Sequence, residues 1–164
     1  MLRISKLTDY AVVLATELAS EGSPRSVTRL SSATGVPAPT TSKVLKSLTR
    51  AGLLESVRGK AGGYRLSRPA EEISVAALIR AIEGPIAVTE CADENDGHIC
   101  SIQEDCGVRA NWQRINRAVE EALEKVRLSD MTIADEKLVP LFRSHVEAER
   151  ERGAEEALEV QDNG

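Results

Sequence analysis

Two helical patterns joined by a glycine turn, with a glycine-rich segment directly after them, constrain the fold of this chain more than any other feature. A short helix is expected from about Thr28. Gly35 supplies the turn, and Pro39 suits the first turn of a helix that runs to about Ala51. That second helix has one apolar stripe and a polar, basic face elsewhere. This order of elements predicts a helix-turn-helix.

The segment from Leu53 to Leu66 is expected to form a β-hairpin. Tyr64 and Leu66 alternate with polar residues, and a cluster of glycines gives the tip its backbone freedom. A hairpin directly after a helix-turn-helix predicts the wing of a winged helix, and its tip carries basic side chains that suit phosphates or a minor groove.

Three further helices are expected from apolar periodicity and caps. They are residues 8–20 with Thr8 as the N-cap, the segment between Ser74 and Gly84, and residues 108–126. Because aromatic residues make up only 2% of the chain, the core must be aliphatic, which favours helices packed on helices. The fold class is therefore mainly α with a small β-hairpin wing, a winged helix-turn-helix with a long dimerisation helix.

The chain is expected to divide into four parts. A winged helix-turn-helix DNA-binding domain covers residues 1–84, a cysteine-containing loop 85–107, a dimerisation helix region 108–145 and an acidic tail, expected to be disordered, 146–164. The long helix over 108–126 has an apolar stripe that so small a head cannot cover, so we expect a homodimer with a symmetric partner helix. The stripe consists of Trp112, Ile115, Val119, Ala122 and Val126.

Charge is distributed unevenly along the chain. Residues 1–70 contain 11 Lys and Arg against 4 Asp and Glu, whereas residues 71–164 contain 10 against 22. A positive front half is the electrostatic footprint of a phosphate-binding surface, so double-stranded DNA is the expected partner. The chain has no apolar run of membrane-spanning length and no signal-peptide pattern, which predicts a cytoplasmic protein without a membrane partner. The sequence shows no nucleophile–base pair and no phosphate-binding loop that would indicate an enzyme.

The candidate DNA contacts lie on the second helix of the helix-turn-helix and on the wing. A basic helix face can be merely solvated, and hydroxyl residues at a helix start can serve only as caps. The position of these candidates on the second helix, beside a basic wing, favours contact with phosphates or base edges. The candidates are Thr40, Thr41, Ser42, Lys43, Lys46, Ser47, Arg50, Arg58 and Lys60.

Three cysteines lie within sixteen residues: Cys91, Cys100 and Cys106. The spacing C-x8-C-x5-C is too loose for a zinc ribbon or a thioredoxin motif, but it is compatible with an iron–sulfur cluster that needs a fourth ligand. Acidic neighbours disfavour bare thiolates, and a bound cationic metal or cluster would compensate. A thiol–disulfide switch and an inert set of buried thiols stay open as alternatives.

Several segments carry a resemblance to a known family. The opening RISKLTDYAVVL, the turn and helix GVPAPTTSKVLKSLTRAGLL, the wing RGKAGGYRLSRP and the following EISVAALIRAIEGP resemble the Rrf-type winged-helix transcriptional regulators. Within the IscR/NsrR-like members, CGVRANWQRINRAVEEAL is most similar to regulators of the SUF iron–sulfur assembly genes. The resemblance covers residues 1 to about 130. It implies a homodimer with one recognition helix in each major groove, and an iron–sulfur cluster whose occupancy sets DNA affinity.

The resemblance also implies a ligand set. Cys91, Cys100 and Cys106 match the three-cysteine loop of the family, and a four-iron or a two-iron cluster fits. In KLTDYAV, Asp9 stands where some members supply an acidic ligand from the partner subunit. An Asp in a first helical turn also suits the helix dipole without further purpose. Some members use a histidine three residues after the last cysteine, but this chain has Arg109, which has no lone pair to donate. His98 and a small thiol are other candidates.

The sequence thus predicts a DNA-binding transcriptional regulator, a repressor, that senses iron–sulfur cluster status and controls cluster assembly genes. One alternative keeps the winged helix and makes the cysteines a thiol–disulfide switch without a cluster. A second alternative is a protein-interaction or cluster-delivery protein that has lost DNA binding, against which the basic recognition helix argues.

Overall fold

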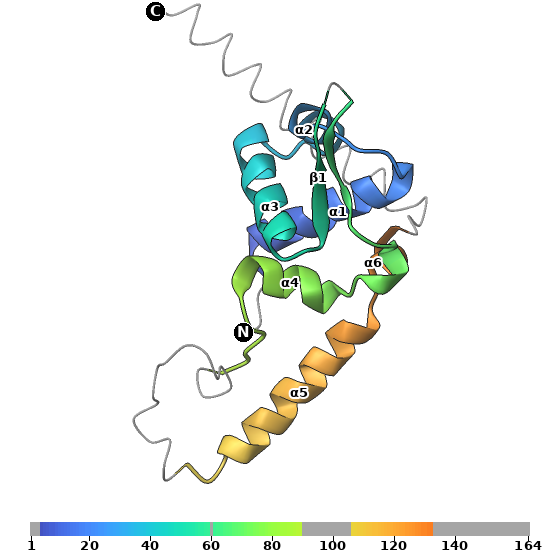
Figure 1. Ribbon diagram of the computed structural model, residues 1–164. Helices are drawn as coiled ribbons and strands as arrows, with labels where there is room; N and C mark the ends of the chain where they lie inside the picture. The colour runs from blue at the N-terminus through green and yellow to red at the C-terminus, as the bar shows by residue number, and fades with distance from the viewer. Residues whose placement is uncertain (1–3, 60, 90–105, 133–164) are drawn as a thin grey trace, which may run out of the picture. The chain divides into compact units, whose positions relative to one another are not determined.

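The computed structural model of the chain describes residues 4–59, 61–89 and 106–132 (Figure 1). It is mainly helical with one two-stranded hairpin, so the predicted fold class is confirmed. Its elements in chain order are α1 (Lys6–Glu21), α2 (Val27–Thr34), α3 (Ala38–Arg50), β1 (Leu54–Val57), β2 (Gly63–Leu66), the 3-10 helix η1 (Ala70–Glu72), α4 (Val75–Glu83), α5 (Arg109–Lys125) and α6 (Leu128–Thr132). The boundaries of the four expected parts stay predictions, and residues 133–164, which include the whole expected tail, lie outside the described residues.

The N-cap of helix α1 lies three residues before the expected one. Ser5 is the N-cap, and its side chain accepts a hydrogen bond from the amide of Thr8 at 3.2 Å. Thr8 is fully buried, and its hydroxyl donates to the carboxylate of Glu83 at the end of α4. The prediction that Thr8 caps the helix is therefore wrong, because Ser5 takes that position and the hydroxyl of Thr8 bonds instead to a carboxylate 75 residues away.

The helix-turn-helix forms as predicted. Helix α2 starts after the N-cap Ser26 and ends at Gly35, whose φ of 73° is the left-handed conformation that glycine adopts without strain. Helix α3 contains Pro39 in its first turn, where a missing amide proton costs no helical hydrogen bond. Its apolar stripe, Val44, Leu45 and Leu48, is fully buried as expected.

The hairpin pairs β1 with β2 in antiparallel register, with Leu54 opposite Leu66 and Ser56 opposite Tyr64. A second pairing anchors it to the loop between α1 and α2. The amide of Arg25 donates to the carbonyl of Tyr64 at 2.9 Å, and the amide of Tyr64 donates back at 2.8 Å. Backbone hydrogen bonds therefore join the two strands of the wing to each other and also fix the wing to the helical head.

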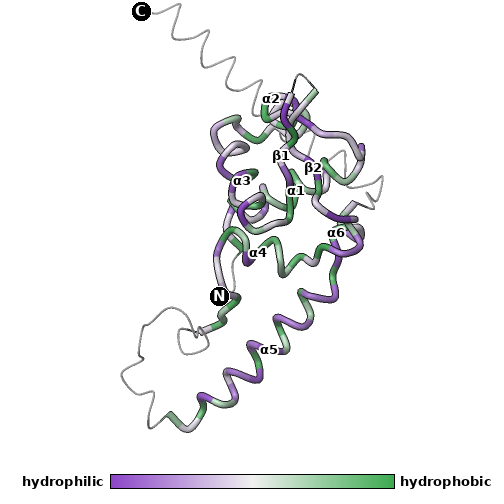
Figure 2. The backbone as a smooth tube through the Cα atoms, in the orientation of Figure 1, coloured by the Kyte–Doolittle hydropathy of each residue, from purple (hydrophilic) through white to green (hydrophobic). Residues whose placement is uncertain are grey.

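The core lies among α1, α2, α3, α4 and the start of α6. Its large side chains with under 2% exposure include Leu14, Leu30, Leu45, Leu48, Ile73, Leu78 and Leu128. Leu128 follows α5 in the chain, and its amide donates to the carbonyl of Ile73 at 2.8 Å. The chain therefore returns to the head after α5, which the sequence pattern did not indicate. Figure 2 shows α5 as largely hydrophilic, with apolar residues recurring between polar ones.

Candidate nucleic-acid interface and cysteine-bearing segment

Helix α3 presents a row of cations on the face opposite its buried stripe. Lys43, Lys46 and Arg50 are all exposed, as their spacing predicted. Thr40, Ser42 and Ser47 are half-buried and lie on the same helix. Because the stripe behind them is fully buried, the helix is fixed to the core while its charged face stays open to a ligand.

Thr41 does not belong to this open face. It is fully buried, and its hydroxyl donates to the carbonyl of Val36 at 3.1 Å. The hydroxyl of Ser31 donates to the same carbonyl at 2.7 Å. These two bonds stabilise the turn between α2 and α3. The prediction of a DNA contact at Thr41 is corrected on this ground, since a buried hydroxyl with an internal acceptor is not available to a phosphate.

The wing supplies a second cationic position. Arg58 is exposed at the end of β1, and Lys60 lies outside the described residues. At the base of the wing, a Cβ added to Gly63 would stand 2.3 Å from the backbone carbonyl carbon of Arg25. A glycine is thus required where the wing crosses the loop before α2.

Arg25 is a basic residue with a structural role that the sequence reading missed. It is 4% exposed, and its guanidinium pairs with Glu17 and Glu21 on α1, the latter through Nε at 2.8 Å. No sequence signal predicts this pairing, because Arg25 lies in the loop after α1 ends at Glu21 and the i,i+4 rule holds only within a helix. Its charge is neutralised inside the head, so it adds little to the positive face that the charge count suggested.

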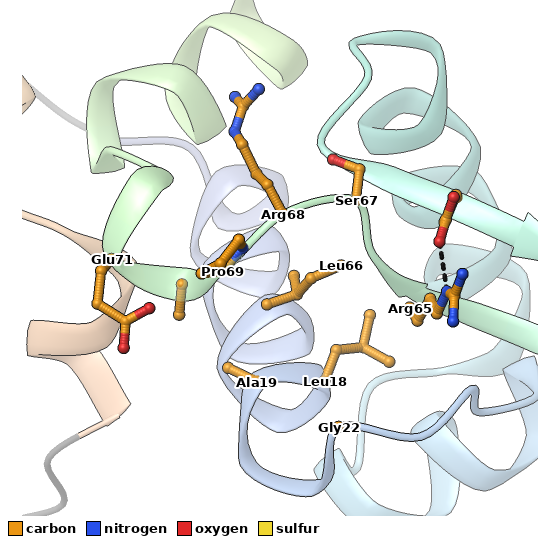
Figure 3. Close-up of a pocket in the computed structure, with 11 residues that line it drawn as sticks. Leu18, Ala19, Gly22, Arg65, Leu66, Ser67, Arg68, Pro69 and Glu71 are labelled. Atoms are coloured by element: carbon orange, nitrogen blue, oxygen red, sulfur yellow. Dashed lines mark hydrogen bonds and ion pairs between the residues drawn. The ribbon is translucent and has the colours of Figure 1, made fainter.

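An open pocket of about 460 Å³ lies between the end of α1, β2 and η1 (Figure 3). Arg65 stands at one side of the labelled lining residues and Glu71 at the other. Arg65 is already paired with Glu55, another lining residue. With both charges in its wall, the pocket does not have the single-sign field of a phosphate or metal site.

The expected apolar stripe of α5 is largely uncovered. Trp112, Ile115 and Val126 are 38%, 45% and 38% exposed, and no residue of α5 is buried. A different face of the helix meets α4, where the guanidinium of Arg80 donates to Glu120 at 2.8 Å and to Glu124.

The carboxylate of Glu83 joins the end of α4 to the start of α1. It accepts the hydroxyl proton of Thr8 and the amide proton of Ser5, the latter at 3.0 Å. The bond from Thr8 is the main reason that the pKa of Glu83 is lowered, and partial burial opposes it. Asp9, the tentative fourth ligand, is exposed on the helical turn that Glu83 holds. Sequence reasoning missed Glu83 because its partners are remote in the chain.

Of the three cysteines, the structure describes one. Cys106 is half-buried with a free thiol, and its carbonyl accepts the amide proton of Arg109 at the start of α5. Cys91, Cys100 and His98 lie outside the described residues. Within the described segments no three His, Cys, Asp or Glu side chains gather as metal ligands would. The predicted ligand set is thus untested and stays a prediction.

A helix-turn-helix with an exposed cationic second helix, followed by a hairpin wing, defines a winged-helix DNA-binding protein. The chain belongs to the Rrf2 family of iron-dependent transcriptional regulators, whose profile matches residues 4–134. The resemblance drawn from the sequence is therefore confirmed. Among the described residues, no helix combines the length and apolar composition needed to cross a bilayer.

Three known proteins show what the chain is similar to. The HTH-type transcriptional regulator NsrR of Oceanobacillus iheyensis is 30% identical over 143 residues, 86% of this chain and 97% of NsrR. CymR, the global cysteine regulator of B. subtilis, is 30% identical with a TM-score of 0.62, over 80% of this chain and 97% of CymR. T. potens IscR is 28% identical with a TM-score of 0.58, over 79% of this chain and 85% of IscR.

Proposed function

We propose that this protein is a homodimeric repressor that binds double-stranded operator DNA and senses iron–sulfur cluster status, with cluster assembly genes as targets. The observation that carries the DNA-binding part is the exposed row Lys43, Lys46 and Arg50 on a helix whose opposite face is locked in the core. Such a protein meets its operator in the cytoplasm, where we place it.

The proposed DNA interface combines α3 with the wing. Lys43, Lys46 and Arg50 contact phosphates or base edges, and Arg58 with Lys60 extends the contact along the wing. Thr40, Ser42 and Ser47 are the neutral donors on α3. The interface leaves out Thr41, whose hydroxyl is engaged with Val36.

The uncovered stripe of α5 supports the homodimer. Trp112, Ile115 and Val126 expose apolar surface that a second copy of α5 would remove from water. A two-fold pairing places identical residues against each other, so one stripe serves both subunits.

The donor set of the cysteine-bearing segment fits an iron–sulfur cluster. Thiolates are the ligands that such clusters prefer, and Cys106 is a free, half-buried thiol directly before α5. Cys91, Cys100 and Cys106 would hold the cluster, of the four-iron or two-iron type, with Asp9 of the partner subunit as the fourth ligand. When bound, the cluster supplies a centre that iron scarcity or oxidants remove. Asp9 lies on α1, which packs against the recognition helix α3. A force that the cluster exerts on Asp9 would therefore be transmitted to α3 through α1 alone.

The thiol–disulfide switch is the second candidate function. It is favoured by the similarity to CymR, which is described as the global cysteine regulator of B. subtilis. The two candidates share the DNA interface and differ only in what the three cysteines do.

The decisive experiment is anaerobic purification followed by iron and sulfide counts per monomer, with duplex binding measured before and after cluster removal. We expect iron with matching sulfide, and at least about a tenfold change in DNA affinity on removal. Cys91→Ala, Cys100→Ala and Cys106→Ala should each lose iron and keep the metal-free DNA affinity. His98→Ala is the matched control in the same segment and should retain iron if Asp9 is the fourth ligand.

Two other outcomes redirect the proposal. Protein that stays free of iron after reconstitution, but forms a reversible disulfide that changes DNA affinity, establishes the thiol switch. Protein that binds iron but no duplex at low salt overturns the repressor and favours a cluster-delivery or protein-interaction role.

A further inference from the structure

Helix α5 meets the rest of the chain through a row of polar side chains, and none of its residues is fully buried. Asn116, Glu120 and Glu124 recur every four residues and share one face. Asn116 bonds to the carbonyl of Ile86 at 2.9 Å and to the amide of Val88 at 2.8 Å, both in the segment after α4. The two glutamates instead meet α4 itself.

Arg80 makes the connection from α4. One guanidinium nitrogen donates to Glu120 at 2.8 Å and the other to Glu124, which stands one turn further along α5. The guanidinium is planar and rigid, so bonds to two successive turns restrict how α5 tilts and rotates against α4. Hydrogen bonds from the hydroxyl of Ser74 and from Arg80 lower the pKa of Glu124, so this carboxylate stays charged.

The carboxyl end of α5 is a fixed point. The amide of Val75 donates to the carbonyl of Val126 at 2.9 Å, and Leu128 enters the core two residues later. With this end held by backbone bonds, the side-chain contacts of Asn116, Glu120 and Glu124 together set its direction. A helix of 17 residues is about 25 Å long, so a 10° swing moves its far end by roughly 4 Å, about one base-pair step of DNA.

We propose that Arg80 is a positioning residue that sets the angle between the DNA-binding head and the dimerisation helix, and thereby the half-site spacing that the dimer accepts. The inference rests on the proposed function, because it needs α5 to pair with a second copy and α3 to enter DNA. The guanidinium of Arg80 is engaged with Glu120 and Glu124 in this arrangement. Its exposed fraction of 37% is consistent with a contact that adjusts geometry rather than holds the core together.

The test is an in-vitro selection from a pool of duplex DNA with two randomised half-sites separated by spacers of different length. Wild-type protein should enrich one spacing. Arg80→Met should enrich the same half-site bases with several spacings, and its preference for the best spacing over the next should fall roughly tenfold, since each dimer loses two such networks. Arg114→Met is the matched control, because it removes the same charge from an exposed position on α5.

A charge-reversed protein keeps the test decisive if Arg80→Met folds poorly. Arg80→Glu combined with Glu120→Lys and Glu124→Lys rebuilds the pairs with opposite signs and should restore a single spacing. Spacing preferences of Arg80→Met equal to those of Arg114→Met overturn the inference.

Residual dipolar couplings of backbone amides report the direction of α5 relative to α1 and α3 without DNA. We expect one orientation in wild-type protein and averaged, smaller couplings in α5 of Arg80→Met. If wild-type protein enriches no duplex, the proposed function fails. The couplings alone then show whether Arg80 fixes the direction of α5. Unchanged couplings in the variant overturn its positioning role.

Discussion

Gly63 stands where no side chain fits. A Cβ there would lie 2.3 Å from the carbonyl carbon and oxygen of Arg25, and the residue has a φ of 155°. We predict that Gly63→Ala lowers the free energy of unfolding by about 1–3 kcal/mol, because the wing must shift away from the head. Urea denaturation followed by circular dichroism measures this. Gly59→Ala, at φ 111° but in open space, is the control and should lose less. Equal losses in both variants would contradict the steric cause.

The carboxylate of Glu83 makes a pH-dependent contribution to stability. A carboxyl whose pKa is lowered by folding stabilises the folded state above its unfolded pKa, and the contribution disappears as pH falls through the folded value. Glu83→Gln should therefore be less stable than wild-type protein at pH 7, by under about 1 kcal/mol because the side chain is exposed, and the difference should shrink below about pH 4.

Thermal unfolding of Glu83→Gln at pH 7, 5 and 3.5 tests this, with Glu71→Gln as a control for removing an exposed acid nearby in the sequence. A stability difference that does not depend on pH would mean that the carboxylate acts only through its shape.

Helix α5 is amphipathic, and the DNA-binding head of the same chain does not cover its apolar face. Its exposed apolar side chains lie on a different face from the residues that meet Arg80. We predict that Ile115→Glu raises the dissociation constant of the homodimer at least about a hundredfold, because a charge would be buried in an apolar seam. Sedimentation equilibrium gives the constant. Arg114→Glu, next in sequence but on another face, should dimerise like wild-type protein. An unaffected dimer in Ile115→Glu would place the interface elsewhere.

The sequence separates a positive amino-terminal half from a negative carboxyl-terminal half, and the affinity of the protein for DNA should depend steeply on salt. Each phosphate neutralised by a cation contributes about 0.9 to the slope of log affinity against log salt. Lys46→Met should therefore reduce the slope by about 1, and Arg114→Met on α5 should leave it unchanged. Fluorescence anisotropy with a labelled duplex at 50–200 mM salt, a range of about fourfold, gives both slopes. An unchanged slope in Lys46→Met would remove that residue from the interface.

Much of the architecture was predictable from neighbouring residues. The cap at Ser74, the turn at Gly35, the place of Pro39 and the buried stripe of α3 were read correctly, because capping and amphipathic burial depend on residues within about one helical turn. The exposed face with Lys43, Lys46 and Arg50 followed from the same periodicity.

Other assignments depended on which side chains meet in the folded chain. A count of charges treated Arg25 and Lys46 alike, yet one is neutralised under the wing and the other faces solvent. Thr41 and Thr8 looked like exposed helix-start residues until Val36 and Glu83 were found as their partners.

The sequence by itself determined the longer helices and the hairpin, since these follow from local spacing, and its resemblance to known regulators indicated the family and the candidate ligands. Only the tertiary structure decided the roles of Thr8, Arg25, Thr41 and Leu128, and the Arg80 connection between α4 and α5. The physical reason is that burial and charge pairing are properties of the packed chain. For Thr8 and Arg80, residues 40 or more positions apart must come together before the partner of the side chain, and with it its role, is defined.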